Sequence, residues 1–593
     1  RIRFSMLKIE NKADIFHYRT LLFVLSFSIL TLLSRYFYLQ VVEHERYSSK
    51  SQVNSVRAQA TYAPRGLILD RNGVVLVENY PTYILTVTPY ELDDKEKQFQ
   101  IISDITEISV DELSTRYKKY YQGQFLPTII AKNLSFAEIS QIEERRLELS
   151  GFQYKRFDER LYNDVLKDAH ILGYLRELDR ESLPFLDKSK LYRAGELIGW
   201  QGLEKQYENE LRYSKGIEYI EVDTYGREIN RINDNNIPAY PGKNLTLSID
   251  SKLQQFSKNL LTDQRGVILV SNVDTGDILS MVSNPSYNLD IYRGETTDSE
   301  WRDLLSNEGK PIINRNIAGL YPPGSSFKII TALNLIENGL LDPEDSLMCT
   351  GSYLPPGSSN TFNCWKEDGH GLVDLNKAIA QSCNVYFYET VQLIKLSDWT
   401  KTAKIFGFQN KTDIDLPNEL IGQIPDKEFF INTYGRWGWS ERGALLNLTL
   451  GQGDILVTPL QSLRYINHIA SRGSTAKLKL NANKKVEYYD DIILSEQTWD
   501  RVIKGLYDVV NSEAGSGWRA KQSEVKLYGK TSTAENPHGE PHAWFNGFFD
   551  FEGQTFSLVV LVENGGGGGA VASPIAGQIV KFFTNEQVEI VNK

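Results

Sequence analysis

The hydrophobic pattern begins with a long apolar segment near the start of the chain. Residues 21–33 are nearly all apolar, and residues 36–42 continue the run after Arg35. A bilayer span takes about 20 residues, so the pattern predicts one membrane helix over residues 20–42, with Arg35 reaching the polar interface. A cleaved signal peptide is the alternative, but no small-residue cleavage site follows, which favours an uncleaved anchor.

Basic residues before this segment predict its orientation. They are Arg1, Arg3, Lys8, Lys12 and Arg19. Positive charge is retained on the cytoplasmic side of a membrane. We therefore expect residues 1–19 to form a cytoplasmic tail and everything after about residue 40 to be extracytoplasmic.

Residues 43–250 mix strand-like and helix-like patterns without any group of residues that indicates chemistry. Asn72-Gly73 separates two apolar runs, which predicts a β-hairpin. Residues 91–150 are charged and follow a helical pattern, which indicates a protruding head. We interpret the whole region as a non-catalytic spacer and docking domain, a pedestal.

Residues 251–593 predict an antiparallel sheet. Residues 266–270 and 278–282 form one predicted hairpin, and residues 542–549 and 555–562 form another. A strand-like run at 524–528, leading to Lys530, makes a fifth strand.

Two helices stand out in the same region. The helix that starts near Ser325 is apolar nearly all round until Asn338-Gly339, so we expect it to be buried. Ser573-Pro574 predicts the start of a last helix that runs to about Phe583.

Length and composition narrow the class of protein. A chain of 593 residues exceeds one hydrophobic core, so two to four units are expected. With 41% hydrophobic and 24% charged residues it is an ordinary globular chain. The net charge of −11 favours neither a nucleic-acid partner nor binding to anionic lipid through the bulk of the protein.

Three short motifs carry the candidate chemistry. Ser325 and Lys328 lie three residues apart on one helix face, where a neutral lysine can take the proton of a serine nucleophile. Taken alone, Ser325 would be interpreted as an ordinary helix N-cap, because serine caps greatly outnumber serine nucleophiles. Ser382-Cys383-Asn384 and Lys530-Thr531-Ser532 follow in the order of the S-x-x-K, S-D-N and K-T-G set of class A β-lactamases and penicillin-binding proteins.

With these motifs the chain resembles class B penicillin-binding proteins, most closely those of bacterial elongation. The stretches from Arg65 to Gly73, from Gly202 to Glu208 and from Pro241 to Asp250 are also similar to segments of that family. The resemblance implies an α+β penicillin-binding transpeptidase fold. In that fold a five-stranded antiparallel sheet has helices on both sides. A mixed α/β pedestal and one transmembrane helix precede this domain in the chain.

The resemblance also implies a mechanism. Ser325 attacks the peptidyl-D-Ala-D-Ala end of a peptidoglycan stem peptide, with Lys328 as the base, and Lys530 is a second cation that lowers the pKa of Lys328. Ser382 relays the proton to the leaving group and Asn384 orients Lys328 or the substrate. The resemblance also implies that Thr531, Ser532 and Thr533 bind the substrate. The backbone N–H groups of Ser325 and Thr533 would form the oxyanion hole.

Ser532 departs from the family, which has glycine at this place. A side chain there is expected to crowd the substrate. We expect strand alternation to turn Ser532 away from Lys530 and Thr531, or else the strand to be shifted locally.

The three cysteines of the chain fall in one short window with a histidine: Cys349, Cys364, His370 and Cys383. A Cys₃His set has the ligand count and type of a structural zinc site, and some relatives carry zinc in this region. The alternative is a Cys349–Cys364 disulfide that leaves Cys383 a buried free thiol. The reaction itself needs no cofactor.

The implied function is D,D-transpeptidation in cell elongation and rod-shape maintenance, with covalent inhibition by β-lactams. The implied partners are peptidoglycan stem peptides, a SEDS-family glycan polymerase of the RodA type, a rod-complex activator of the MreC type and the bacterial inner membrane, with the catalytic domain in the periplasm. Two alternatives stay open. One is a serine β-lactamase or β-lactam sensor, and the other is a non-enzymatic scaffold with a decayed site.

Overall fold

The computed structural model describes residues 12–45, 56–121, 123–124, 127–166, 168–178, 181–187, 192, 196–222, 228–292 and 298–591. Arg1, Arg3 and Lys8 of the predicted cytoplasmic tail lie outside these residues. The chain forms two compact units. The first holds residues 1–63, 84–155 and 213–241, and the second holds residues 64–83, 156–212 and 242–593. The division at residue 250 stays a prediction.

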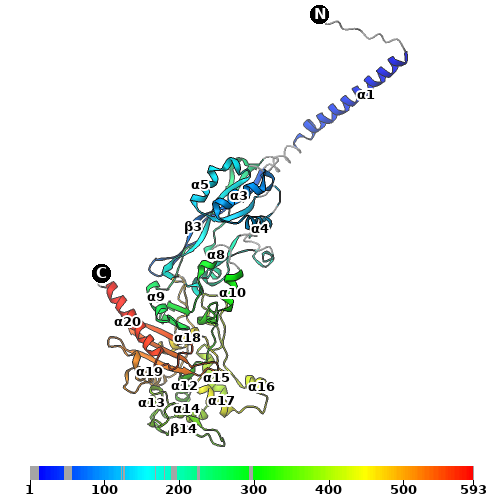
Figure 1. Ribbon diagram of the computed structural model, residues 1–593. Coiled ribbons are helices and arrows are strands. Elements are labelled where there is room, and N and C mark those ends of the chain that lie inside the picture. Colours follow the sequence, from blue (N-terminus) through cyan, green and yellow to red (C-terminus); the bar gives the residue numbers. More distant parts are fainter. Residues whose placement is uncertain are drawn as a thin grey trace. The chain divides into compact units, whose positions relative to one another are not determined.

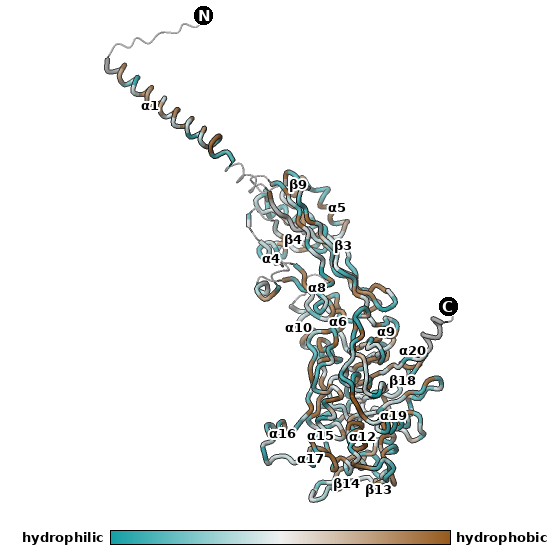
Figure 2. Tube along the Cα trace, turned by 180° about the vertical axis from the view of Figure 1, so that it is seen from behind, coloured by the Kyte–Doolittle hydropathy of each residue, from teal (hydrophilic) through white to brown (hydrophobic). Residues whose placement is uncertain are grey.

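The first unit begins with the predicted apolar helix. Helix α1 (Lys12–Phe37) continues into a π-helical turn at Tyr38–Val42. The stretch Ile15–Val42 is long and apolar enough to cross a membrane, and none of its hydrophobic window is buried. Hydrophobic positions recur along the length of α1 in Figure 2. The helix therefore starts earlier than the predicted residue 20.

The rest of the first unit contains the predicted helices of the head. They are α3 (Lys95–Thr106), α4 (Val110–Tyr120) and α5 (Phe136–Glu144), with strand β4 (Thr128–Leu134) between the last two. Side-chain caps fix where they begin, as at Ser135, which forms a reciprocal capping box with Glu138. A separate sheet has the strand order β1-β8-β9 and consists of β1 (Val56–Thr61), β8 (Gly216–Val222) and β9 (Glu228–Ile237).

The second unit begins with the predicted Asn-Gly hairpin. Strands β2 (Ile68–Leu69) and β3 (Val75–Val87) pair antiparallel around it. The Asp70 carboxylate accepts from the backbone N–H groups of Asn72 and Val74, and Gly73 supplies the positive φ of +83° that the turn requires. The hairpin prediction is confirmed.

A buried ion network lies beside this hairpin. The Glu204 carboxylate is fully buried and accepts from Arg65 Nε and Arg160 Nε, each at 2.7 Å. Arg65 also reaches Glu208 at 2.7 Å. Each charge has a partner at hydrogen-bond distance, which offsets the desolvation cost of burying it.

The central sheet of the second unit confirms the strand prediction. Its antiparallel order is β12-β11-β19-β18-β17. The strands are β11 (Gly266–Asn272), β12 (Ile278–Asn284), β17 (Leu527–Ala534), β18 (His542–Phe551) and β19 (Gln554–Val562). Strand β17 is an edge strand. The sequence pattern placed Lys530 just after the strand-like run at 524–528, whereas the structure places it within β17.

Helices cover both faces of this sheet. Phe556 and Ser557 are neighbours in β19, so their side chains point to opposite faces. Ser557 donates to Asn467 of α18 (Pro459–Ala470), whereas Phe556 packs on Phe583 of α20 (Ala572–Val591) with ring centroids 4.6 Å apart. Figure 1 shows α20, in red, against the orange strands. The predicted α+β fold is confirmed, although α20 extends beyond Phe583.

The helix after Ser325 is buried, as predicted. Helix α12 (Lys328–Glu337) has apolar residues on nearly every side and ends at Asn338, followed by Gly339 with φ +60°. Ser325 itself lies before it, in a 3₁₀ turn over Gly324–Phe327.

The remaining elements are β5 (Phe152–Tyr162), α6 (Ala169–Leu172), β6 (Leu175–Glu177), β7 (Leu197–Gly199), α7 (Gly202–Gln206), α8 (Glu208–Leu211), β10 (Leu245–Thr246), α9 (Ser251–Leu260), α10 (Asp298–Ser306), α11 (Arg315–Ala318), β13 (Leu347–Cys349), β14 (Ser352–Tyr353), β15 (Phe362–Asn363), β16 (Gly371–Val373), α13 (Leu375–Ala380), α14 (Asn384–Thr390), α15 (Leu396–Ile405), α16 (Lys427–Tyr434), α17 (Glu441–Thr449) and α19 (Glu496–Asn511).

The buried ion network yields a stability prediction. Glu204→Gln leaves the guanidinium groups of Arg65 and Arg160 buried without a counter-charge between them, so we expect the free energy of unfolding to fall by about 3–5 kcal/mol. Thermal and urea unfolding measure it. Arg472→Ala, which removes an exposed ion pair with Glu496 and Asp500, is the matched control and should change stability by less than about 1 kcal/mol. A Glu204→Gln variant as stable as the parent would contradict the prediction.

Candidate active site

The turn that carries Ser325 is fixed by its neighbours. Ser325 is half-buried, while Gly324 and Ser326 on either side are buried. The Gly324 N–H donates to Gly451 O at 3.0 Å. Gly324 has φ +59°, and a Cβ atom added to it would lie 3.2 Å from Ser532 Cβ. The turn therefore requires glycine for its backbone conformation as well as for its close approach to β17.

Lys328 opens α12 and is fully buried. Its Nζ donates to Ser382 O at 2.8 Å, Ser382 Oγ at 3.1 Å and Asn384 Oδ1 at 2.7 Å. Burial lowers the pKa of Lys328 to about 8. A substantial neutral fraction is therefore present near neutral pH, as a base requires.

Lys530 approaches the same hydroxyl from β17. Its Nζ donates to Ser382 Oγ at 3.0 Å and to Thr531 O at 3.0 Å. Burial and the neighbouring charge of Lys328 lower the pKa of Lys530 well below its ordinary value. The Ser382 hydroxyl thus joins two buried amines, and its own proton remains available for a further partner.

Ser382 is presented by the junction between α13 and α14. It has φ +56°, in the left-handed region that non-glycine residues seldom adopt. The indole Nε1 of Trp365 donates to Ser382 O at 3.1 Å and to Gln381 O at 3.0 Å. Sequence reasoning missed Trp365, whose position directly after Cys364 was the available signal.

The open edge of β17 presents backbone groups of Thr533. Thr533 O accepts from the Gln452 side chain at 3.3 Å, so it points away from β18. In an antiparallel strand the N–H and C=O of one residue point to the same side. The Thr533 N–H therefore also faces the open edge.

The side chains of β17 correct one prediction. Ser532 does not point away from Lys530, because residues i and i+2 of a strand share a face. Ser532 Oγ accepts from the Ser326 N–H at 2.6 Å, on the nucleophile side. Thr531 and Thr533 occupy the opposite face. Thr531 Oγ1 lies 2.7 Å from Ser516 Oγ, a contact that sequence reasoning missed although glycines on both sides of Ser516 mark a tight turn.

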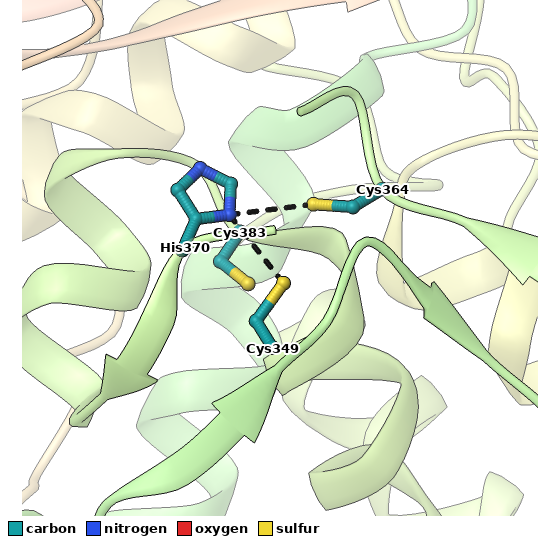
Figure 3. Close-up of side chains that lie close together, drawn as sticks. All are labelled: Cys349, Cys364, His370 and Cys383. Carbon is teal, nitrogen blue, oxygen red and sulfur yellow. Dashed lines mark hydrogen bonds between the residues drawn. The ribbon is translucent and has the colours of Figure 1, made fainter. Parts of the chain in front are cut away.

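The three cysteines and the histidine meet, although they come from different elements (Figure 3). Cys349 ends β13, Cys364 follows β15, His370 precedes β16 and Cys383 caps α14. All four are buried, and their ligand atoms lie within 4.8 Å of one another. The Sγ atoms of Cys349 and Cys364 are each 3.5 Å from His370 Nδ1. The three thiols are free.

These distances suit a tetrahedral metal ion. With Zn–S about 2.3 Å and Zn–N about 2.0–2.1 Å, a tetrahedral zinc ion holds sulfur and nitrogen ligands about 3.5 Å apart. The donors are those that zinc prefers. The residues present therefore fit zinc in both chemistry and spacing.

Comparison with known proteins identifies the family. Residues 266–581 match the penicillin binding protein transpeptidase domain. The chain belongs to this family. Residues 60–247 match the penicillin-binding protein dimerisation domain. The family resemblance predicted from the three motifs is confirmed.

Relatives cover nearly the whole chain. The peptidoglycan D,D-transpeptidase MrdA of Salmonella typhimurium is 28% identical over 93% of this chain and 93% of its own. In the complex of penicillin-binding protein 2 with MreC from Helicobacter pylori, the matching chain is 27% identical with a TM-score of 0.80, over 89% of this chain and 99% of that one. A chain from a structure described as the structural coordination of polymerization and crosslinking by a peptidoglycan synthase complex is 25% identical with a TM-score of 0.71, over 96% of this chain and 98% of that one.

Proposed function

We propose that this member of the penicillin-binding transpeptidase family is a peptidoglycan D,D-transpeptidase that works through a Ser325 acyl-enzyme. The observation that carries the proposal is the buried chain from Lys328 through Ser382 to Lys530, which ends beside the turn of Ser325. Burying two amines against one hydroxyl costs desolvation free energy. A non-enzymatic scaffold would gain nothing in return for that cost.

Acylation begins at the penultimate carbonyl of a D-Ala-D-Ala stem peptide. Neutral Lys328 takes the Ser325 proton as Oγ forms a bond to that carbonyl carbon. The carbonyl oxygen becomes negative and is held by the N–H groups of Ser325, at the start of the turn, and Thr533, on the open edge. The bond between the two D-alanines then breaks, and the leaving amine receives its proton through Ser382.

Substrate binding and the second half-reaction use the same groups. Lys530 would hold the terminal carboxylate of the donor, whose negative charge would favour the ammonium form of that lysine. The hydroxyls of Thr531 and Thr533 would reach the same carboxylate at the open edge, from the other face of β17. Asn384 would orient Lys328, because its Oδ1 accepts a hydrogen bond from Lys328 Nζ. An amine of a neighbouring stem peptide attacks the acyl carbon, a new peptide bond forms, and Ser325 recovers its proton. β-Lactams would acylate Ser325 at the same position.

The same proposal covers location and partners. The helix α1 would anchor the chain in the inner membrane as a single pass, with residues 1–19 in the cytoplasm and the transpeptidase domain in the periplasm. An activator of the MreC type and a glycan polymerase of the RodA type are the partners. The H. pylori MreC complex and the peptidoglycan synthase complex support this part of the proposal.

Zinc at Cys349, Cys364, His370 and Cys383 is the finer part of the proposal. The ion would be structural and would supply no step of the reaction. Cys383 lies between Ser382 and Asn384, so holding its Sγ would fix the junction that presents both side chains to Lys328. His370 would bind through Nδ1, the nitrogen that faces the sulfur atoms.

Ser325 is tested by its covalent adduct. Wild-type protein with benzylpenicillin should gain one penicilloyl mass that maps to Ser325 and persists for many minutes, and Ser325→Ala should gain none. Ser326→Ala removes a hydroxyl whose hydrogen-bond partner among the described residues is Pro323 O, at 2.8 Å. This variant is the control and should keep the adduct. Rapid release of the penicilloyl group would instead identify a β-lactamase.

The pH dependence follows from Lys328. The neutral amine is the active form, so the acylation rate should rise with pH and reach half its maximum near pH 8. Asn384→Ala removes an acceptor that stabilises the ammonium form, so it should lower the midpoint as well as the rate. Stopped-flow acylation by a fluorescent penicillin measures both. A rate that falls between pH 7 and pH 9 would contradict Lys328 as the base.

Zinc is tested by metal content and thiol reactivity. We expect about one zinc per chain, no thiol that reacts rapidly in the native protein, and loss of the metal in Cys349→Ser. The acylation rate should fall with the metal because the Cys383 junction loosens. A reactive thiol without metal, or a Cys349–Cys364 disulfide in peptide maps, would refute the zinc proposal.

A further inference from the structure

Ser532 joins the nucleophile turn to the edge strand. Its Oγ accepts from the Ser326 N–H at 2.6 Å, and its side chain is buried, with 2% exposed. Among the described residues this is the hydrogen bond that links the turn Gly324–Phe327 directly to β17. The resemblance to class B enzymes gives glycine at this place, and glycine has no side-chain acceptor for that N–H.

Ser326 and Ser532, which share this hydrogen bond, are the immediate neighbours in sequence of the two residues whose N–H groups are proposed to bind the oxyanion. Ser326 follows Ser325, and Ser532 precedes Thr533. A bond between Ser326 N and Ser532 Oγ therefore limits the separation of the Ser325 and Thr533 N–H groups. An oxyanion hole requires both donors at about 2.7–3.1 Å from the developing charge, so this separation bears directly on the transition state.

Other contacts hold the turn from its opposite side. Ser326 Oγ donates to Pro323 O at 2.8 Å, and Tyr465 Oη donates to Ser326 O at 3.4 Å. The Gly324 N–H donates to Gly451 O at 3.0 Å. These bonds fix the turn on α18 and on the segment after α17. That segment reaches β17 through Gln452, which donates to Thr533 O at 3.3 Å, so it links the turn to β17 only indirectly, whereas Ser532 Oγ links them directly.

We propose that Ser532 is a positioning residue that sets the geometry of the oxyanion hole, rather than a group that contacts or crowds the substrate. The inference rests on the proposed acyl-transfer function. Its consequence is specific: loss of the hydroxyl lowers the rate of acylation, because the donors align less well with the transition state, but leaves binding of the intact β-lactam unchanged.

The test compares Ser532→Ala and Ser532→Gly with wild type in the full-length chain. Stopped-flow acylation by a fluorescent penicillin separates the dissociation constant of the first complex from the acylation rate constant. We expect the rate constant to fall about five- to tenfold in both variants, as for one lost hydrogen bond. The dissociation constant should change by less than about twofold. The pH midpoint should stay at the wild-type value, since no partner of Lys328 is altered.

Two further variants separate positioning from general stability. Ser532→Thr retains an Oγ acceptor and should recover most of the rate constant. Ser248→Ala removes an equally buried hydroxyl, bonded to Ile278 O at 2.7 Å and Lys479 O at 3.1 Å. It should reduce thermal stability without changing the acylation rate constant.

The opposing outcomes are distinct. A Ser532→Gly variant that acylates faster than wild type would show that the side chain crowds the substrate, and one that acylates equally fast would show that the hydroxyl does not position the oxyanion hole. An effect confined to the dissociation constant would show a substrate contact. Any of these results overturns the inference while the proposed function stands. Absence of any adduct in the wild-type protein would instead refute the proposed function.

Discussion

Two buried lysine side chains share one serine hydroxyl, and the site depends on that arrangement. Lys328 and Lys530 lie 3.1 Å and 3.0 Å from Ser382 Oγ, and both are excluded from water. Two ammonium groups so close in a dry interior repel each other, and each has lost its hydration. The protein therefore favours a state in which at least one amine is neutral, and a neutral amine beside a serine is what acyl transfer requires.

This arrangement requires three separate parts of the chain to meet. The turn before α12 and the first residue of that helix bring Ser325 and Lys328. The α13–α14 junction brings Ser382 and Asn384, and the edge strand β17 brings Lys530. The junction is the least regular of the three, because Ser382 adopts a left-handed backbone conformation. The indole of Trp365 and the cluster that includes Cys383 both act on this junction. A structural zinc ion would thus contribute to catalysis only by keeping Ser382 and Asn384 in place.

The departure from the family pattern at Ser532 is consistent with the same geometry. Glycine at the third place of the last motif allows close approach of the substrate and of the nucleophile turn. Ser532 preserves the close approach, because its Oγ is directed at the Ser326 N–H and not at the open edge. The side chain of Ser532 therefore does not occupy the open edge beside Thr533, and a side chain at this place is compatible with the proposed reaction.

The sequence alone determined the family, the order of the motifs, the five strands and the buried helix. These follow from local periodicity and from residue types at short spacing. The sequence could also identify the Cys₃His set as a candidate metal site, because its three cysteines, a rare residue type in this chain, lie close together along the sequence. The sequence could not place Ser532 on the correct face, reveal Trp365, or assign Ser325 to a turn before the helix. Those features depend on the register of β17 against β18 and on hydrogen bonds between residues up to 206 positions apart. Contacts of that kind form only when distant segments pack, so tertiary structure decided them.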